Sequence, residues 1–271
     1  MSLGWININN YSFSSLLLLE RFQIRIMLHY AGWSTDKEEW KKSMGIALAA
    51  NAEVRWYLEH RCPECAGQIT ELIANAPVTS DKEQIRVAEV YVMAGVEDFI
   101  VYTTPEVMAE KCDFIRGWNK AHLFDLVDFT GKTVLDIGAG SGRLTFAAAE
   151  KAAWVYASEP VGTLREFMRE KIKNQGIKNV RVLDGLITDI PFPDDTFDIV
   201  MSGHVIGDEL DTELAEMNRV CKPGGWLIDC PGDSEGNLSP CPELTSRGWE
   251  EIYYVGSYGK DVYIHRKQVV K

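Results

Sequence analysis

The sequence has no uninterrupted apolar stretch long enough to cross a membrane. Its most apolar run, SLLLLERFQIRIML, is broken by Glu20, Arg21 and Arg25, whereas a spanning helix needs about 20 apolar residues. The basic region and small-residue cleavage site that mark a signal peptide are also missing. The sequence therefore predicts no membrane insertion and a cytoplasmic location.

Basic residues and cysteines are scarce. The chain has 28 Lys and Arg against 40 Asp and Glu, a formal net charge of -12. This charge argues against a general binder of nucleic acid or anionic membrane, because both need a basic surface. Six cysteines in 271 residues, without a secretion signal, predict reduced thiols rather than a disulfide framework.

The chain also lacks internal repeats and low-complexity segments, and its pattern predicts three parts. Residues 1–30 are an N-terminal extension of uncertain status, with Met27 as a hypothetical natural start. Residues 31–125 are predicted to be helical and to cover a substrate pocket. Residues 126–271 are predicted to form an α/β domain, since 46% hydrophobic content can bury one large core and a smaller one.

The helical part is predicted from apolar residues at spacings of three and four. One helix follows Ser34 or Thr35 as the cap and runs through DKEEWKKSMGIALAANAEVRWYLEH. A second covers CAGQITELIANA, and a third follows Ser80 and runs through DKEQIRVAEVYVMAGVEDFIVY. A last helix is expected over PEVMAEKCDFIRGWNKAHLFDLV.

From Thr133 onward short apolar strands alternate with helices. This alternation predicts a Rossmann-like, doubly wound, seven-stranded sheet that is mostly parallel, with ligands at the carboxyl ends of its strands. The last two strands, IYYVGSYG and KDVYIHRKQVV, are joined by a short turn at Gly259 and Lys260. They are therefore expected to form an antiparallel hairpin at one edge.

A glycine-rich turn follows the first strand, in VLDIGAGSGRL at residues 134–144. Glycines let the backbone turn sharply and approach a ligand, and the helix that follows presents free amide groups. A dinucleotide site has G-x-G-x-x-G, but here Arg143 stands at the last glycine position. This difference weakens the prediction of a nicotinamide dinucleotide and leaves it as an alternative.

Four motifs in order resemble the class I S-adenosylmethionine-dependent methyltransferases, most closely those of ubiquinone and menaquinone biosynthesis. The motifs are VLDIGAGSGRL, the acid of YASEP, IPFPDDTFDIV, and RVCKPGG before a strand. Together with the closing hairpin, the resemblance covers roughly residues 130 to 271. The resemblance implies S-adenosyl-L-methionine as the cofactor. It implies the transfer of a methyl group to a small, partly apolar molecule.

The resemblance also implies which residues bind the cofactor. The glycine turn would contact the methionine portion, Asp136 would anchor the turn, and Glu159 would accept the ribose hydroxyl groups. An acid expected after the third strand is replaced by Leu186, so adenine is expected to contact apolar side chains, with Asp184 as an alternative partner. The predicted cofactor-binding residues are Asp136, Gly138, Ala139, Gly140, Arg143, Glu159, Pro160, Leu186, Ile187, Ser202 and Gly203.

His204, directly after the fourth strand, is the candidate catalytic residue. Its ordinary pKa near 6.5 suits proton removal at neutral pH. Related enzymes often have a non-catalytic residue at this place, and that alternative stays open.

The C-x-x-C pair Cys62 and Cys65 has the spacing of zinc ligands, and Cys112 with His122 would complete a set of four. Because a second close pair is missing, no metal is predicted. A redox pair and two ordinary buried thiols stay open as alternatives.

Two other classes of function are compatible with the sequence: a non-catalytic S-adenosylmethionine-binding or interaction protein, and an NAD-dependent oxidoreductase. A nucleic-acid methyltransferase would need an N-P-P-Y or D-P-P-Y string, which is absent. The predicted partner is a small-molecule substrate, and a homodimer is left open.

Overall fold

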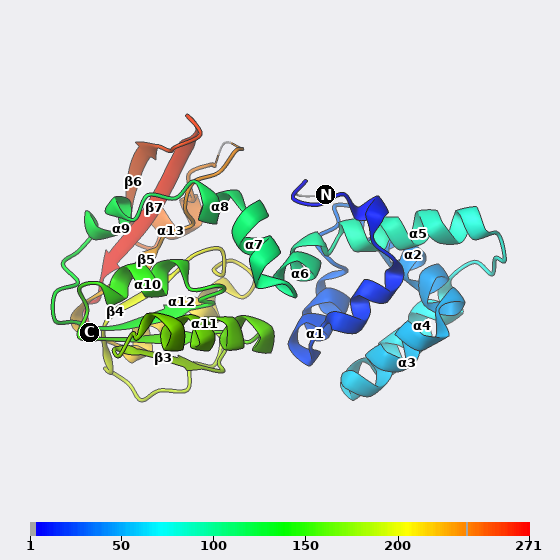
Figure 1. Cartoon of the computed structure of the whole chain (residues 1–271), viewed down its shortest axis with the longest axis horizontal. Coiled ribbons are helices and arrows are strands. Elements are labelled where there is room, and N and C mark those ends of the chain that lie inside the picture. The colour runs from blue at the N-terminus through cyan, green and yellow to red at the C-terminus, as the bar shows by residue number, and fades with distance from the viewer. Residues whose placement is uncertain (1–3, 237) are drawn as a thin grey trace. The chain divides into compact units, whose positions relative to one another are not determined.

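The computed structural model describes residues 4–236 and 238–271 (Figure 1). The chain divides into two compact units, Met1–Lys111 and Cys112–Lys271, named here the helical unit and the α/β unit. The boundary expected at residue 125 from the sequence lies inside the second unit. The assignment of residues 31–125 as a substrate cover stays a prediction.

The helical unit consists of short helices joined by turns. None of the helices in the described residues is both long and apolar enough to cross a membrane. The elements of this unit are η1 (Ile8–Asn10), η2 (Phe13–Leu18), α1 (Arg21–Tyr30), α2 (Lys37–Ala50), α3 (Ala52–Arg61), η3 (Pro63–Cys65), α4 (Ala66–Asn75), α5 (Lys82–Ala94), α6 (Glu97–Tyr102) and α7 (Pro105–Lys111).

The long helix expected across residues 36–60 is divided at Asn51, so its predicted continuity is wrong. The Asn51 side chain donates to the backbone oxygen of Ala47 and to Glu89 of α5, at 2.9 and 2.8 Å. This tertiary contact stabilises the break between α2 and α3. The predicted caps are also displaced, because Asp36 and Asp81 accept the first-turn amides instead of Ser34, Thr35 and Ser80.

The segment before Met27 is part of the helical unit's core. Phe13, Leu16 and Leu19 are each at most 1% exposed and pack in the same apolar cluster as Trp40. The hypothesis that the natural chain starts at Met27 is not tested by this packing. A chain without the segment would nevertheless leave part of this core uncovered.

Glu97, at the start of α6, is buried in the helical unit with 1% of its surface exposed. Its carboxylate accepts hydrogen bonds from the backbone N–H groups of Trp5 at 2.7 Å, Ile6 at 3.0 Å and Gly4 at 3.3 Å. Charged acceptors form strong hydrogen bonds to amides. Glu97 therefore fixes the start of the described chain to α6.

The α/β unit has seven strands and six helices within the described residues. The strands are β1 (Thr133–Ile137), β2 (Trp154–Ser158), β3 (Val180–Leu183), β4 (Phe197–Ser202), β5 (Cys221–Asp229), β6 (Glu250–Val255) and β7 (Asp261–Gln268). The helices are α8 (Asp113–Arg116), α9 (Ala121–Phe124), α10 (Arg143–Ala149), α11 (Gly162–Gln175), α12 (Leu210–Val220) and α13 (Pro242–Thr245).

The strand order β3-β2-β1-β4-β5-β7-β6 confirms the predicted fold class. The first five strands are parallel, and β7 is antiparallel to both β5 and β6. The order reverses beside β1, where β2 lies on one side and β4 on the other. Ligands of doubly wound sheets bind at such a point.

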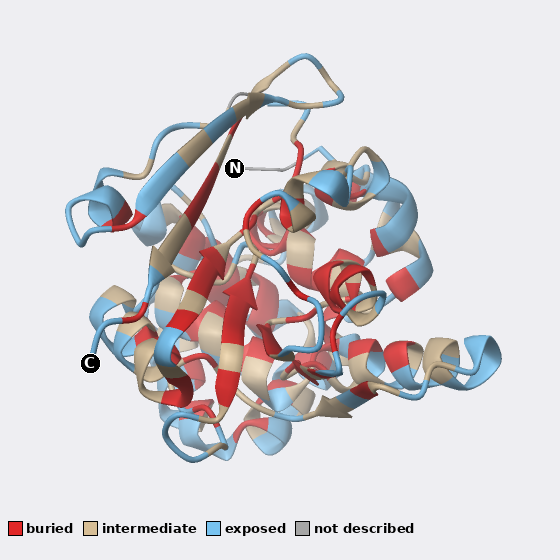
Figure 2. Ribbon diagram, turned by 90° about the vertical axis from the view of Figure 1, so that its left-hand side faces the viewer, coloured by how far each residue is buried: buried red, intermediate tan, exposed pale blue. Residues whose placement is uncertain are grey.

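Alternate residues of the central strands face two separate apolar layers. Val134, Val155 and Ile199 pack with α10, while Leu135 and Val200 pack with α12. Figure 2 shows the central strands as largely buried, in red, whereas β6 at the edge has no buried residue and β7 contains both buried and half-buried residues. Burial on both faces explains why these strands are almost continuously apolar.

The single helix expected over residues 105–127 is wrong, because this stretch forms the three short helices α7, α8 and α9. Cys112 is extended between α7 and α8. At Gly117 an added Cβ would lie 2.5 Å from the Tyr258 ring. This close approach of the β6–β7 turn ends α8 after one turn of helix.

Candidate functional site

The glycine turn lies between β1 and α10 in the α/β unit. Gly138, Gly140 and Gly142 have φ values of 63°, 58° and 89°, in the left-handed region where residues with a Cβ are strained. A Cβ on Gly138 would also lie 2.6 Å from a methyl group of Val205. Ala139, between the glycines, is buried, and its N–H donates to the backbone oxygen of Ser158 at 3.0 Å.

Glu159, the residue after β2, lies against this turn. Its two carboxylate oxygens accept the N–H groups of Gly140 and Val161, both at 2.8 Å. The side chain is 4% exposed, and this burial raises the pKa of Glu159 to about 7. Each oxygen retains a further lone pair for a ligand hydroxyl.

A second buried carboxyl group, Asp136 of β1, lies below the turn. Thr145 of α10 donates its hydroxyl to Asp136 at 2.5 Å, which ties the strand to the helix that follows the turn. Burial raises the pKa of Asp136 to about 7. Its contacts are those of a group that anchors the turn.

Two serine hydroxyls flank the end of β1. Ser158, the last residue of β2, and Ser202, the last residue of β4, both pair in register with Ile137. Both Oγ atoms are buried and have no hydrogen-bond partner among the described residues. Such groups are rare in native structures and imply a ligand or an ordered water.

Ser158 was missed by the sequence analysis. A polar residue directly before Glu159, at the end of a buried apolar strand, is the signal that could have found it. Gly185, after β3, lies so close that an added Cβ would be 2.5 Å from the Ser158 Oγ.

The residues expected around adenine lie after β3. Ile187 is 8% exposed and belongs to the apolar layer beside α12, whereas Leu186 is half-buried and pairs with Asp189 in an isolated bridge. Asp184 is exposed and forms an ion pair with Arg165 at 3.2 Å. Arg165 also donates to the backbone oxygen of Glu159 at 2.7 Å.

Pro160 follows Glu159 and is half-buried just before α11. The stretch from Glu159 to α11 is thus fixed by both the Glu159 carboxylate and the Arg165 guanidinium.

His204 follows β4 in an unusual backbone conformation, with φ at 64°. Strained residues of this kind concentrate at functional sites. The His204 side chain reaches solvent on one side and has its ring centroid 4.5 Å from that of Phe114. Surrounding protein atoms and the positive charge of Arg143 lower the pKa of His204 below its ordinary value, which keeps the imidazole neutral at neutral pH.

Arg143, the first residue of α10, joins the turn to the end of β5. Its Nη2 donates to the backbone oxygens of Cys230 and Pro231 at 2.7 and 3.0 Å, and its guanidinium lies 4.7 Å from the Trp118 ring centroid. Its Nη1 is buried without a hydrogen-bond partner in the described chain. Gly203 leaves the space for this contact, since a Cβ there would be 2.8 Å from Nη2.

Phe114 and Trp118 lie within residues 31–125, the predicted helical part, but they belong to the α/β unit. The α8 segment is held there by Asp113, whose carboxylate accepts the Ser234 hydroxyl at 3.1 Å and the Glu235 N–H at 2.8 Å. The Phe114 ring is thereby fixed beside His204. No sequence motif indicated this contact.

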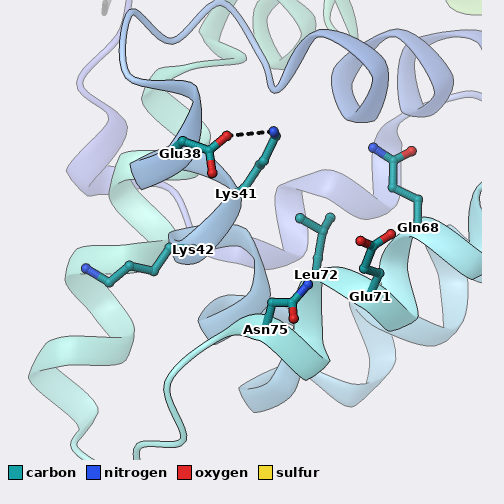
Figure 3. A pocket seen from close by; sticks show the side chains of 7 residues that line it. All are labelled: Glu38, Lys41, Lys42, Gln68, Glu71, Leu72 and Asn75. Atoms are coloured by element: carbon teal, nitrogen blue, oxygen red, sulfur yellow. Dashed lines mark hydrogen bonds and ion pairs between the residues drawn. The ribbon is translucent and has the colours of Figure 1, made fainter.

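A cavity of about 380 Å³ between α2 and α4 of the helical unit is a different kind of space (Figure 3). Its lysines form helical ion pairs, Lys41 with Glu38 at 2.8 Å and Lys42 with Glu39 at 3.0 Å. These side chains are largely exposed, so the cavity lacks the buried unpartnered groups of the glycine turn. Among the described residues, no three or more His, Cys, Asp or Glu side chains are grouped so that they could hold a metal.

Comparison with known proteins agrees with this geometry. Residues 135–229 match the family model described as "Methyltransferase domain", and these residues contain the glycine turn, Glu159 and His204. Residues 135–229, about a third of the chain, therefore form a methyltransferase domain. The glycine turn after β1, the acid after β2 and the strand order of the sheet are those of the class I, S-adenosylmethionine-dependent methyltransferases.

The chain is similar to a demethylmenaquinone methyltransferase of Geobacillus sp. (strain WCH70), with 33% identity over 46% of this chain and 51% of that protein. It is also similar to an uncharacterized methyltransferase of Geobacillus kaustophilus, with 27% identity over 52% of this chain and 66% of that protein. The chain thus spans about half to two thirds of these relatives.

The fold is shared with a solved structure, a putative S-adenosyl-L-methionine-dependent methyltransferase of Methanococcus maripaludis. The TM-score is 0.50 at 17% identity, covering 63% of this chain and 94% of that one. At this identity the similarity shows the fold alone.

Proposed function

We propose that the protein is a methyltransferase that uses S-adenosylmethionine to methylate a small, partly apolar molecule. The observation that carries this proposal is the buried Glu159 carboxylate, which accepts the Gly140 N–H of the glycine turn. Two serine hydroxyls without partners among the described residues, on Ser158 and Ser202, flank the end of β1 that leads into this turn. A partly apolar acceptor is supported by relatives named demethylmenaquinone methyltransferase. A cytoplasmic location remains part of the proposal.

The residues at the turn fit the cofactor's polar groups. When bound, S-adenosylmethionine supplies a methyl group on a sulfonium, already activated for transfer. Glu159 would accept the two ribose hydroxyls with its free lone pairs, while the left-handed glycines keep side chains away from the methionine portion. Ser202 and Ser158 have hydroxyls that lack partners in the protein and would gain them on binding.

The residues after β4 would position the acceptor. His204 is held in a strained conformation beside the Phe114 ring. Its imidazole would be neutral and could take a proton from the acceptor, although the lowered pKa makes it a weaker base than an ordinary histidine. Phe114 would supply one apolar wall of the acceptor site. Holding the acceptor in line with the methyl group and excluding water is the main catalytic requirement.

We further propose that the helical segment covers the substrate pocket. The proposed partner is a small-molecule substrate. The proposal does not depend on the oligomeric state.

The proposal is tested first by binding and then by turnover. Isothermal titration calorimetry with S-adenosylmethionine, S-adenosylhomocysteine and NAD should show binding of the first two only, and Glu159→Ala should weaken both. Turnover is then measured as S-adenosylhomocysteine release with a panel of quinols, phenols, amines and thiols. Cofactor binding without turnover would favour the non-catalytic alternative, and preference for NAD would refute the proposal.

A further inference from the structure

The two cysteines of the C-x-x-C motif lie at the corner between α3 and α4 in the helical unit. Cys62 directly follows α3, and Cys65 directly precedes α4, with the single turn η3 closing the corner. Their Sγ atoms are 3.3 Å apart, and both are free thiols. The methyltransferase chemistry proposed above makes no use of this pair.

The surroundings of the pair do not favour a metal. Zinc requires about four ligands, and the described chain offers no cluster of three or more suitable groups. The nearest acid, Glu64, pairs instead with Arg21 of α1 at 2.8 Å. Two adjacent thiols without further metal ligands can still react with each other by thiol–disulfide exchange.

The two thiols differ in how readily they react. Cys62 is fully buried, and burial together with the neighbouring Cys65 thiol raises the pKa of Cys62 to about 12. Cys65 is 6% exposed and directly precedes the ten-residue helix α4, so it is the more accessible of the two thiols. Cys65 is therefore the thiol that reacts first with an oxidant from solution.

We propose that Cys62 and Cys65 form a redox-sensitive pair that closes to an intramolecular disulfide when the protein meets a low-molecular-weight disulfide. The Cys65 thiolate attacks one sulfur of that oxidant and releases one thiol, forming a mixed disulfide. Cys62 then gives up its proton and displaces the second thiol. Two electrons and two protons leave the pair, one S–S bond forms in the protein, and the oxidant is reduced to two thiols.

The new bond would stiffen a corner that other elements depend on. Cys62 and Cys65 belong to the core cluster that also contains Trp40 of α2. Helix α4 packs so closely on α2 that a Cβ at Gly45 would lie 2.2 Å from the backbone oxygen of Leu72. Because the thiols are already 3.3 Å apart and a disulfide needs about 2.05 Å, the bond can close with little movement of the helices.

The experiment equilibrates the full chain in glutathione buffers of increasing glutathione disulfide content, followed by acid quenching, alkylation in denaturant and mass spectrometry. The expected result is a protein lighter by two hydrogen atoms, with residues 62 and 65 linked in one peptide. Cys62→Ser should accumulate a glutathione adduct on Cys65. Cys65→Ser should leave Cys62 as a free thiol, and Cys241→Ser, in the other unit, should oxidise like the original chain.

Full alkylation of both cysteines across all buffers would overturn the proposal, and so would thiols that resist oxidation because they retain zinc. A glutathione adduct on Cys62 in the Cys65→Ser variant would overturn the assigned order of attack. None of these readouts depends on methyl transfer, so the proposed function and this inference can fail separately.

Discussion

Glu97 in the helical unit and Glu159 in the α/β unit are both almost completely buried, with 1% and 4% of their surface exposed. Glu97 accepts three backbone N–H groups from a segment more than ninety residues away in sequence. Glu159 accepts one from Gly140 of the glycine turn and one from Val161 of its own segment, and the ends of β2 and β4 in the same unit carry two serine hydroxyls without partners among the described residues. Burial alone therefore does not distinguish a structural acid from an acid that binds a ligand. The distinction comes from polar groups in the same unit that lack hydrogen-bond partners in the protein.

The largest effect should come from Glu97→Ala. It leaves three backbone donors without their acceptor, and an unsatisfied buried donor costs about 1 to 3 kcal/mol. We expect the free energy of unfolding of the helical unit to fall by about 3 kcal/mol in urea denaturation. Cofactor affinity should change less than twofold.

The matched control is Glu64→Ala in the same unit, which breaks an exposed pair with Arg21. It should leave the denaturation midpoint unchanged. Equal denaturation midpoints for Glu97→Ala and Glu64→Ala would show that Glu97 does not stabilise the helical unit through its hydrogen bonds.

His204→Asn should lower kcat by about 100-fold, the lower end of the range for a lost general base. Asparagine tolerates the left-handed backbone found at this position, so the change tests the imidazole rather than the fold. Cofactor affinity should be unaffected. The control is His122→Asn, which removes a ring stacked on Tyr254 at 3.7 Å, and equal kcat values for both variants would exclude His204 as the base.

Glu159→Gln should weaken S-adenosylmethionine binding about tenfold, equivalent to about 1.4 kcal/mol. Since burial raises the pKa of Glu159 to about 7 and ribose hydroxyls donate to the ionised form, binding releases a proton below that pH. Affinity of the unmodified protein should therefore fall as pH drops from about 7 to 5.5 and stay level above 7. In Glu159→Gln the dependence of affinity on pH should be weaker, and any dependence that remains would come from the titration of Asp136.

Calorimetry at several pH values measures this effect, with Glu166→Gln on the exposed side of α11 as the control. The same pH slope in Glu159→Gln as in the unmodified protein would mean that Glu159 does not meet the ribose.

The two units also differ in how far their sequences predict them. In the α/β unit, short apolar strands alternate with helices, so the doubly wound fold class, the edge hairpin and the place of Glu159 after the second strand could be predicted from local patterns. In the helical unit the helices could be predicted but their ends could not. The break at Asn51 depends on Glu89, thirty-eight residues away in sequence.

The candidate site shows the same limit. Asp136 lies in β1, Gly140 follows β1, and Glu159 follows the adjacent strand β2, an arrangement that a sequence pattern can indicate. Phe114 beside His204 depends on bonds from Asp113 to residues 234 and 235. No periodicity or motif connects segments so far apart, so this contact required the structure.

Ser158→Ala should have the smallest effect and tests the two hydroxyls directly. The Ser158 Oγ has no partner in the described protein, so removing it should leave the free energy of unfolding unchanged or slightly higher, in contrast to Glu97→Ala. If the cofactor supplies the missing partner, affinity should fall about threefold, since a net hydrogen bond contributes about 0.5 to 1.5 kcal/mol. Ser202→Ala should behave alike, and Ser246→Ala, on an exposed turn, should change neither quantity. Unchanged affinity in both buried variants would mean that the hydroxyls hold ordered water, and that Glu159 alone distinguishes the binding unit from the structural one.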